Sequence, residues 1–171
     1  MNFGIPTIVF GFICLGFAGA YVFAEWRGSR HVSRTAKAVA STAFVLLAVV
    51  NGAADSTYGI LILAALGFSW FGDLFLLSLR NEFLLAGIVA FLIAHVAYAA
   101  AFVSRGIDPI AFVIALILWN TAAFFMLYWL WKYLAGYFRI AVPVYLAAIT
   151  LMTALAVATN SPIAVIAGIA F

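Results

Sequence analysis

The sequence predicts an all-α fold, a polytopic transmembrane helical bundle with six full spans and the start of a seventh. Of its 171 residues, 69% are hydrophobic and 8% are charged. A soluble domain is about half apolar and about a quarter charged, and a core of this size could not shield so much apolar surface from water. The apolar runs are continuous and about 20 residues long, as in membrane-spanning helices, whereas barrel strands are about 10 residues long and alternate in polarity.

The first apolar run, residues 4–24, is predicted to be a retained helix rather than a cleaved signal peptide. Only Met1 and Asn2 come before Phe3, and the positive charges follow the run instead of preceding it. A cleaved signal has a basic start and a shorter apolar stretch.

Short polar breaks delimit the later spans. We expect these spans at residues 36–54, 57–79, 83–104, 109–131 and 139–159. A seventh begins at Pro162, but ten residues rise only about 15 Å as a helix, which is half a bilayer. We therefore expect the natural protein to continue past Phe171, so that residues 1–171 form a single transmembrane domain lacking the C-terminal end of its bundle.

The basic residues predict the orientation. The odd-numbered breaks, together with the first residues of the spans that follow them, hold seven of them: Arg27, Arg30, Arg34, Lys37, Arg80, Lys132 and Arg139. The even-numbered breaks hold only Arg105. Because cytoplasmic loops are enriched in Lys and Arg, we expect the N-terminus outside, the first loop in the cytoplasm and the protein in the cell inner membrane. Basic residues confined to segment ends also argue against a nucleic-acid partner, despite a pI near 9.2.

Asp73 is the clearest candidate for function, since ionisable groups inside a span are costly. In a span that ends at residue 79 it lies six residues from the inner end, roughly 9 Å deep. Desolvation favours the neutral form of a carboxyl group, and a protonated carboxyl can act as a general acid. The alternatives are an Asp paired with Lys or Arg, or a water-bound carboxyl near the membrane edge. Gly72 beside it allows close approach by a neighbouring helix or a ligand.

A second group follows one face of the span 83–104. Phe91, His95 and Tyr98 are spaced i, i+4 and i+7, and Gly87 extends the stripe. This face could line one elongated cavity with Asp73, or His95 could be a buried residue that hydrogen-bonds between helices.

Other polar residues admit two interpretations each. Lys37 and Arg34 are either topology signals or a cationic lip for a phosphate headgroup. Asn120 is either a link between helices or a hydrogen-bond donor in a cavity. Cys14, the only cysteine, excludes an intrachain disulfide. With two His and no His-Glu-x-x-His, the sequence gives no zinc signal, nor does it hold the Gly-x-Ser-x-Gly of a serine hydrolase.

The segment 68–102 resembles the central signature of the YhhN family, the lysoplasmalogenase-like membrane proteins. The matching residues are Gly72-Asp73-Leu74-Phe75-Leu76-Leu77, Phe83, Gly87, Phe91, His95 and Tyr98. Arg34-Thr35-Ala36-Lys37 is similar to the family's Lys-Pro stretch, although Ala38 replaces the Pro, and Tyr145 with Met152 is similar to its sixth helix. Gly168-Ile169-Ala170-Phe171 looks like the start of the family's seventh helix of about eight, so a second acidic residue would lie beyond Phe171.

The resemblance implies hydrolysis of the vinyl ether of a lysoplasmalogen to a fatty aldehyde and glycerophospho-ethanolamine or -choline, with no metal or organic cofactor. Asp73 would be the acid or the stabilising carboxylate, and His95 and Tyr98 would position water or the glycerol hydroxyl. The lysophospholipid would enter laterally from the cytoplasmic leaflet. The site so predicted has catalytic Asp73, His95 and Tyr98, and substrate-binding Lys37, Gly72, Gly87, Phe91 and Asn120.

Two other classes of function stay open. A small proton-coupled transporter or lipid-handling membrane protein would use Asp73 and His95 as a proton relay, although the paired repeats common in transporters are not visible in the sequence. A structural membrane subunit would use Gly and Ala faces for packing, which leaves the residues around Asp73 unexplained.

Overall fold

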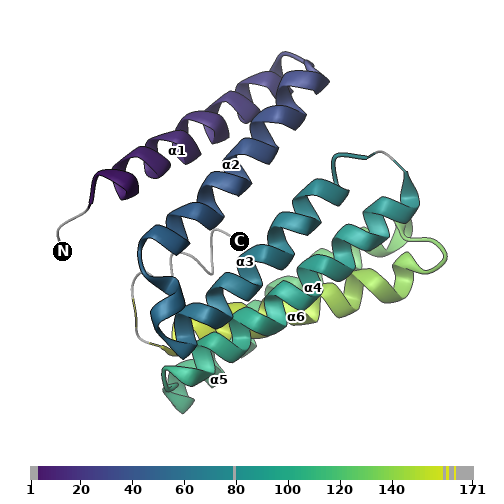
Figure 1. Ribbon diagram of the computed structural model, residues 1–171. Helices are drawn as coiled ribbons and strands as arrows, with labels where there is room; N and C mark the ends of the chain where they lie inside the picture. Colours follow the sequence, from purple (N-terminus) through teal and green to yellow (C-terminus); the bar gives the residue numbers. More distant parts are fainter. Residues whose placement is uncertain (1–3, 79, 160, 162–163, 165–171) are drawn as a thin grey trace.

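The computed structural model describes residues 4–78, 80–159, 161 and 164, and within them the fold is all-helical (Figure 1). Among these described residues, six helices are long and apolar enough to cross a membrane. They are α1 (Ile5–Trp26), α2 (Arg30–Val50), α3 (Thr57–Phe75), α4 (Asn81–Ser104), α5 (Pro109–Leu130) and α6 (Phe138–Ala158), with short 3₁₀ turns at Ala53–Asp55 (η1) and Trp131–Tyr133 (η2). This confirms the predicted class of fold. Pro162, the predicted start of a seventh span, lies outside the described residues.

Local sequence signals explain where these helices begin and end. Gly52 follows α2 with φ of 75°, a left-handed conformation that glycine adopts without strain. The Ser56 hydroxyl accepts a hydrogen bond from the backbone N–H of Gly59 and so caps α3. Asp108 caps α5 in the same way, and Pro109 follows as its first residue.

Three boundaries differ from the hydropathy prediction by four residues or more, and one of them is the end of α2, which lies at Val50 instead of residue 54. Helix α2 begins at Arg30, six residues before the predicted apolar span, because the Arg, His and Lys residues of its first turns are compatible with a helix although they are not apolar. Helix α3 ends at Phe75 instead of residue 79, and Leu76–Ser78 form a turn. Asp73 therefore lies two residues from the end of its helix, about 3 Å along the axis. The predicted distance of six residues from the inner end of the span was therefore wrong, whereas the depth below the membrane surface stays a prediction.

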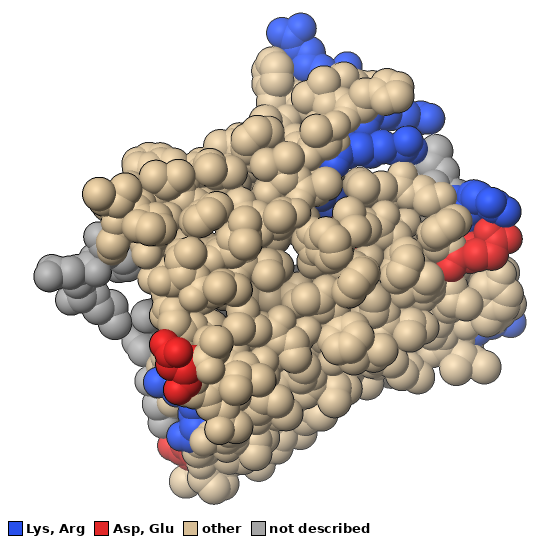
Figure 2. Space-filling model, viewed as in Figure 1, with Lys and Arg blue, Asp and Glu red and all other residues tan. Residues whose placement is uncertain are grey.

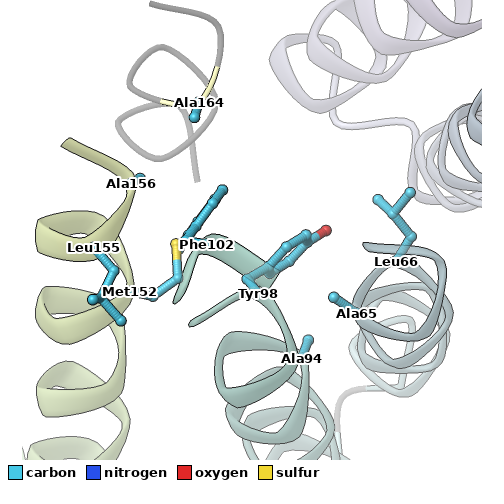
Figure 3. Packing of buried hydrophobic residues seen from close by; sticks show 9 residues of the cluster. All are labelled: Ala65, Leu66, Ala94, Tyr98, Phe102, Met152, Leu155, Ala156 and Ala164. Carbon is cyan, nitrogen blue, oxygen red and sulfur yellow. The ribbon is translucent and has the colours of Figure 1, made fainter. Parts of the chain in front are cut away.

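The helices form three antiparallel hairpins, α1–α2, α3–α4 and α5–α6, and α4 also packs on α6 (Figure 1). The core lies among α3, α4 and α6 and contains Ala65, Leu66, Ala94, Tyr98, Phe102, Met152, Leu155 and Ala156, together with Ala164 (Figure 3). Small residues at these contacts allow close helix packing, as is common in membranes.

Helix α1 is peripheral. It packs chiefly on α2, and most of its apolar side chains are exposed. The hairpin α1–α2 in turn reaches the rest of the bundle through α2 and α3 (Figure 1). We call the end of the bundle that carries the α1–α2, α3–α4 and α5–α6 turns the basic end, because it holds all the Lys and Arg residues except Arg105. On the face shown in Figure 2, charged side chains gather toward the ends and leave the middle uncharged.

Candidate functional site

An ion pair between α2 and α3 is the centre of the candidate site. The Lys37 ammonium nitrogen lies 3.0 Å from a carboxylate oxygen of Asp73, and each side chain is about a quarter exposed, at 25% and 24%. The pair joins the last turn of α3 to the third turn of α2. It is the ion-paired state that the sequence left open as an alternative for Asp73. Because both groups are partly exposed, the pair contributes little to stability.

The pair borders a groove of about 520 Å³ formed by α1, α2 and α3. Each helix contributes a stripe at helical spacing: Cys14, Ala18 and Tyr21 from α1, Lys37, Ala40, Ser41, Phe44 and Val45 from α2, and Leu66, Ser69, Trp70 and Asp73 from α3. Phe91 of α4 completes the lining. The volume is within the range of small-molecule sites, about 300–1,000 Å³.

The groove is polar at one end and mostly apolar elsewhere. Lys37 and Asp73 lie toward the basic end, whereas Leu66 lies seven residues earlier in α3, about 10 Å along the axis. Val45 and Phe44 lie at a similar distance from Lys37 along α2. A cavity with a charged end and an apolar body about 10 Å long suits an amphiphile with one polar group and one chain.

Trp70 and Thr42 fix the wall of the groove between α2 and α3. The indole N–H of Trp70 donates a hydrogen bond of 2.9 Å to the Thr42 hydroxyl. Trp70 and Ser69 were not among the site residues predicted from the sequence. Their spacing of three and four residues before Asp73 places all three on one helix face, and this is the signal that could have identified them.

Gly72 and Gly87 serve helix packing. A Cβ atom added to Gly72 would lie 2.7 Å from the Phe91 ring, and one added to Gly87 would lie 3.0 Å from the Leu76 side chain. Both glycines thus allow α3 and α4 to approach closely, and Gly72 makes room for the aromatic ring that borders the groove. In this structure the neighbour that approaches Gly72 closely is helix α4, through the ring of Phe91.

His95 and Tyr98 lie behind the groove and are absent from its lining. His95 is completely buried; its Nδ1 bonds with the Phe91 carbonyl oxygen, and its ring meets that of Tyr145 edge to face at 5.3 Å. Tyr98 is 7% exposed and stacks on Phe102 in the core. The structure therefore does not bring His95 and Tyr98 into one cavity with Asp73.

Asn120 lies far from the groove lining. It is exposed on α5, and its side-chain amide donates to the carbonyl oxygen of Leu116 in its own helix. Among the described residues no group of three His, Cys, Asp or Glu comes together that could hold a metal ion.

Comparison with protein families connects this site to a known group. A model of the YhhN family matches residues 32–171. The chain belongs to the YhhN family. The matched segment contains Lys37, Asp73 and Phe91, so the ion pair and the α4 wall of the groove fall inside the YhhN region, whereas α1 precedes it. Comparisons with curated proteins and with solved structures returned no match.

Proposed function

We propose that this YhhN-family membrane protein hydrolyses the vinyl ether bond of lysoplasmalogens, releasing a fatty aldehyde and glycerophospho-ethanolamine or -choline. One observation carries the proposal: the Lys37–Asp73 pair lies at the polar end of an otherwise apolar groove. Membership of the family is consistent with a lysoplasmalogenase-like role.

The groove suits a lipid with a single chain. The alkenyl chain would lie along Phe44, Val45 and Leu66, where apolar contact stabilises it. The glycerol and the ether oxygen would then lie at the polar end, beside Asp73.

The reaction needs an acid and a water molecule. Addition of a proton to the β-carbon of the vinyl ether converts R–O–CH=CH–R′ into the oxocarbenium ion R–O⁺=CH–CH₂–R′. Water then adds to the cationic carbon and loses a proton, which gives a hemiacetal. The hemiacetal collapses to the alcohol R–OH and the aldehyde O=CH–CH₂–R′, so that one water is consumed and the proton is returned.

Asp73 is the residue to which we assign this chemistry. As a carboxylate beside Lys37 it stabilises the oxocarbenium ion and takes a proton from the attacking water. In its protonated form it is the donor to the β-carbon, as one carboxyl group of a glycosidase is to a leaving oxygen. Lys37 provides a positive charge beside the glycerophosphate.

His95 and Tyr98 are positioning residues in this proposal. His95 bonds with the backbone of Phe91, whose ring borders the groove, and contacts the ring of Tyr145. Tyr98 packs in the core one turn further along α4. Both act through the wall of the groove, because neither lines it.

Aldehyde release from purified protein in lipid nanodiscs tests the proposal. A lysoplasmalogen should yield fatty aldehyde, and its ester-linked counterpart should yield no fatty acid. Asp73→Asn should lower aldehyde release at least a thousandfold, while the matched control Glu82→Gln, an exposed acid paired with Arg80, should retain it. Release of fatty acid from the ester-linked lipid would show that the protein cleaves an ester bond, and the vinyl ether assignment would then be wrong. No product from either lipid would favour a transporter or lipid-handling protein.

A further inference from the structure

The stripes that line the groove continue beyond it toward the basic end. On α1 the lining residues Cys14, Ala18 and Tyr21 are followed, four residues on, by Glu25. Residues spaced three, four and seven apart lie on one face of a helix. Glu25 is therefore the next side chain on the face of α1 that borders the groove.

Helix α2 continues its stripe in the same way. Lys37, Ser41 and Phe44 line the groove, and Arg34 lies three residues before Lys37, one turn nearer the basic end. Arg34 is half-buried, and it forms no ion pair with any residue that the structure describes. In Figure 2 basic side chains lie in the hollow between the α1–α2 hairpin and the rest of the bundle.

A hydrogen bond holds Glu25 next to the start of α2. The hydroxyl of Ser33, a buried residue, donates to Oε1 of Glu25. Because Ser33 precedes Arg34 in the chain, this bond keeps the Glu25 carboxylate close to the backbone that carries Arg34. A carboxylate accepts several hydrogen bonds, so the contact with Ser33 leaves it able to accept from a ligand as well.

Apart from the hydrogen bond from Ser33, which links α1 to α2, neither the helix dipole nor topology favours an acidic side chain at Glu25. Glu25 lies in the last turn of α1, where the helix dipole disfavours a negative charge. The positive-inside rule accounts for Arg34, but it gives no reason for an acidic side chain at the same place. An Arg and a Glu that follow the groove lining by one turn on the same helix faces are complementary to a ligand that carries both charges.

The spacing matches a glycerophospholipid. Arg34 lies about 4.5 Å along the helix axis from Lys37. Three glycerol carbons separate the phosphate oxygen from the ether oxygen of a lysoplasmalogen, a distance close to one helical turn, about 5 Å. With the vinyl ether at Asp73, the phosphate therefore reaches the level of Arg34.

We propose that Arg34 and Glu25 form a headgroup clamp that selects zwitterionic lysophospholipids, with Arg34 binding the phosphate and Glu25 binding the ammonium of ethanolamine or choline. This inference rests on the proposed function, since it assumes that a lysolipid occupies the groove. It names the residues that distinguish one headgroup from another.

Binding of non-cleavable lipids tests the clamp without relying on catalysis. The probes are three saturated alkyl ethers with the same chain: an alkyl lysophosphoethanolamine, an alkyl lysophosphatidic acid and an alkylglycerol. Affinities are measured for protein in nanodiscs. Arg34→Gln should weaken both phosphate-bearing probes roughly tenfold, as expected for a charge-assisted hydrogen bond, and should leave alkylglycerol unchanged, which also shows that the groove is intact.

Glu25→Gln should weaken only the ethanolamine probe, by roughly threefold, since Glu25 is exposed. Glu25→Lys should reverse the headgroup preference, so that the alkyl lysophosphatidic acid binds more tightly than the alkyl lysophosphoethanolamine. Matched controls at the same end of the bundle, Arg27→Gln and Glu82→Gln, should change none of the three affinities. Two results would overturn the clamp. One is an equal change of probe affinity in Arg34→Gln and Arg27→Gln. The other is an equal loss of affinity for all three probes in Glu25→Gln. Because the probes are not cleaved, this result is independent of whether the protein releases aldehyde.

Discussion

Gly72→Ala gives a test of the wall beside Asp73 that can be worked out from the structure. The added methyl group would lie 2.7 and 2.8 Å from two carbons of the Phe91 ring, closer than such contacts occur in proteins, and 3.0 Å from a third. The ring must move, and overpacking of this kind costs about 1–3 kcal/mol. Because the ring borders the groove and has space on that side, we expect the lower end of this range, about 1 kcal/mol. The displaced ring should narrow the groove and raise the KM for a lysolipid.

Gly67→Ala is the matched control in the same helix. A Cβ atom at Gly67 meets nothing within 4 Å. Replacement by Ala should therefore leave the protein equally stable or stabilise it by up to about 1 kcal/mol, the helix propensity difference. The KM should not change.

The assay is reversible unfolding in detergent micelles, with Phe91→Leu as the second arm of a double-mutant cycle. Removal of the ring should relieve the clash, so the double variant Gly72→Ala with Phe91→Leu should be more stable than the sum of the single effects by about 1 kcal/mol. Equal stability of the Gly72→Ala and Gly67→Ala proteins, or additive effects of Gly72→Ala and Phe91→Leu, would show that the added methyl group does not clash with the Phe91 ring.

Three further predictions concern α2, α3 and the orientation. In denaturant titrations, Trp70→Phe and Thr42→Val should each destabilise the protein by about 0.5–1.5 kcal/mol, the contribution of one hydrogen bond. The double variant should be little less stable than either single variant, because both changes remove the same bond. Fully additive effects would exclude the bond. Lys37→Gln should change the free energy of unfolding by less than about 1 kcal/mol, because the ion pair is partly exposed. The same change should lower aldehyde release at least tenfold. Unchanged turnover would show that Lys37 is not part of the site. A cysteine placed at Arg30 in a cysteine-free background should react with impermeant reagents only from the cytoplasm, and one at Arg105 only from outside; the opposite pattern would invert the topology.

The sequence was sufficient for the class of fold. Continuous apolar runs with short polar breaks predict membrane helices, and the described residues form six of them. Sequence alone did not locate the ends of α2 and α3, because hydropathy detects the apolar stretch and cannot detect a helix that continues past Arg30 or one that stops within a run of Leu.

The candidate site was predicted in part. The spacing around Asp73 identified a helix face, and the alternative of a pair with Lys or Arg matches the contact with Lys37. The participation of α1 could not be predicted, because which helices meet depends on how side chains interdigitate and not on the period of one helix. For the same reason the stripe of Phe91, His95 and Tyr98 gave no indication that Phe91 borders the groove while His95 is buried behind it.

The most direct test of the central claim is mass spectrometry of the aldehyde released from a lysoplasmalogen in deuterium oxide. Protonation of the β-carbon places one deuterium on the carbon next to the aldehyde group, so the wild-type protein should give a singly deuterated aldehyde of full chain length. Aldehyde added to the same mixture should take up no deuterium, and Asp73→Asn should give no product above background. An undeuterated or shortened aldehyde, or equal release by Asp73→Asn, would contradict hydrolysis by this carboxyl group.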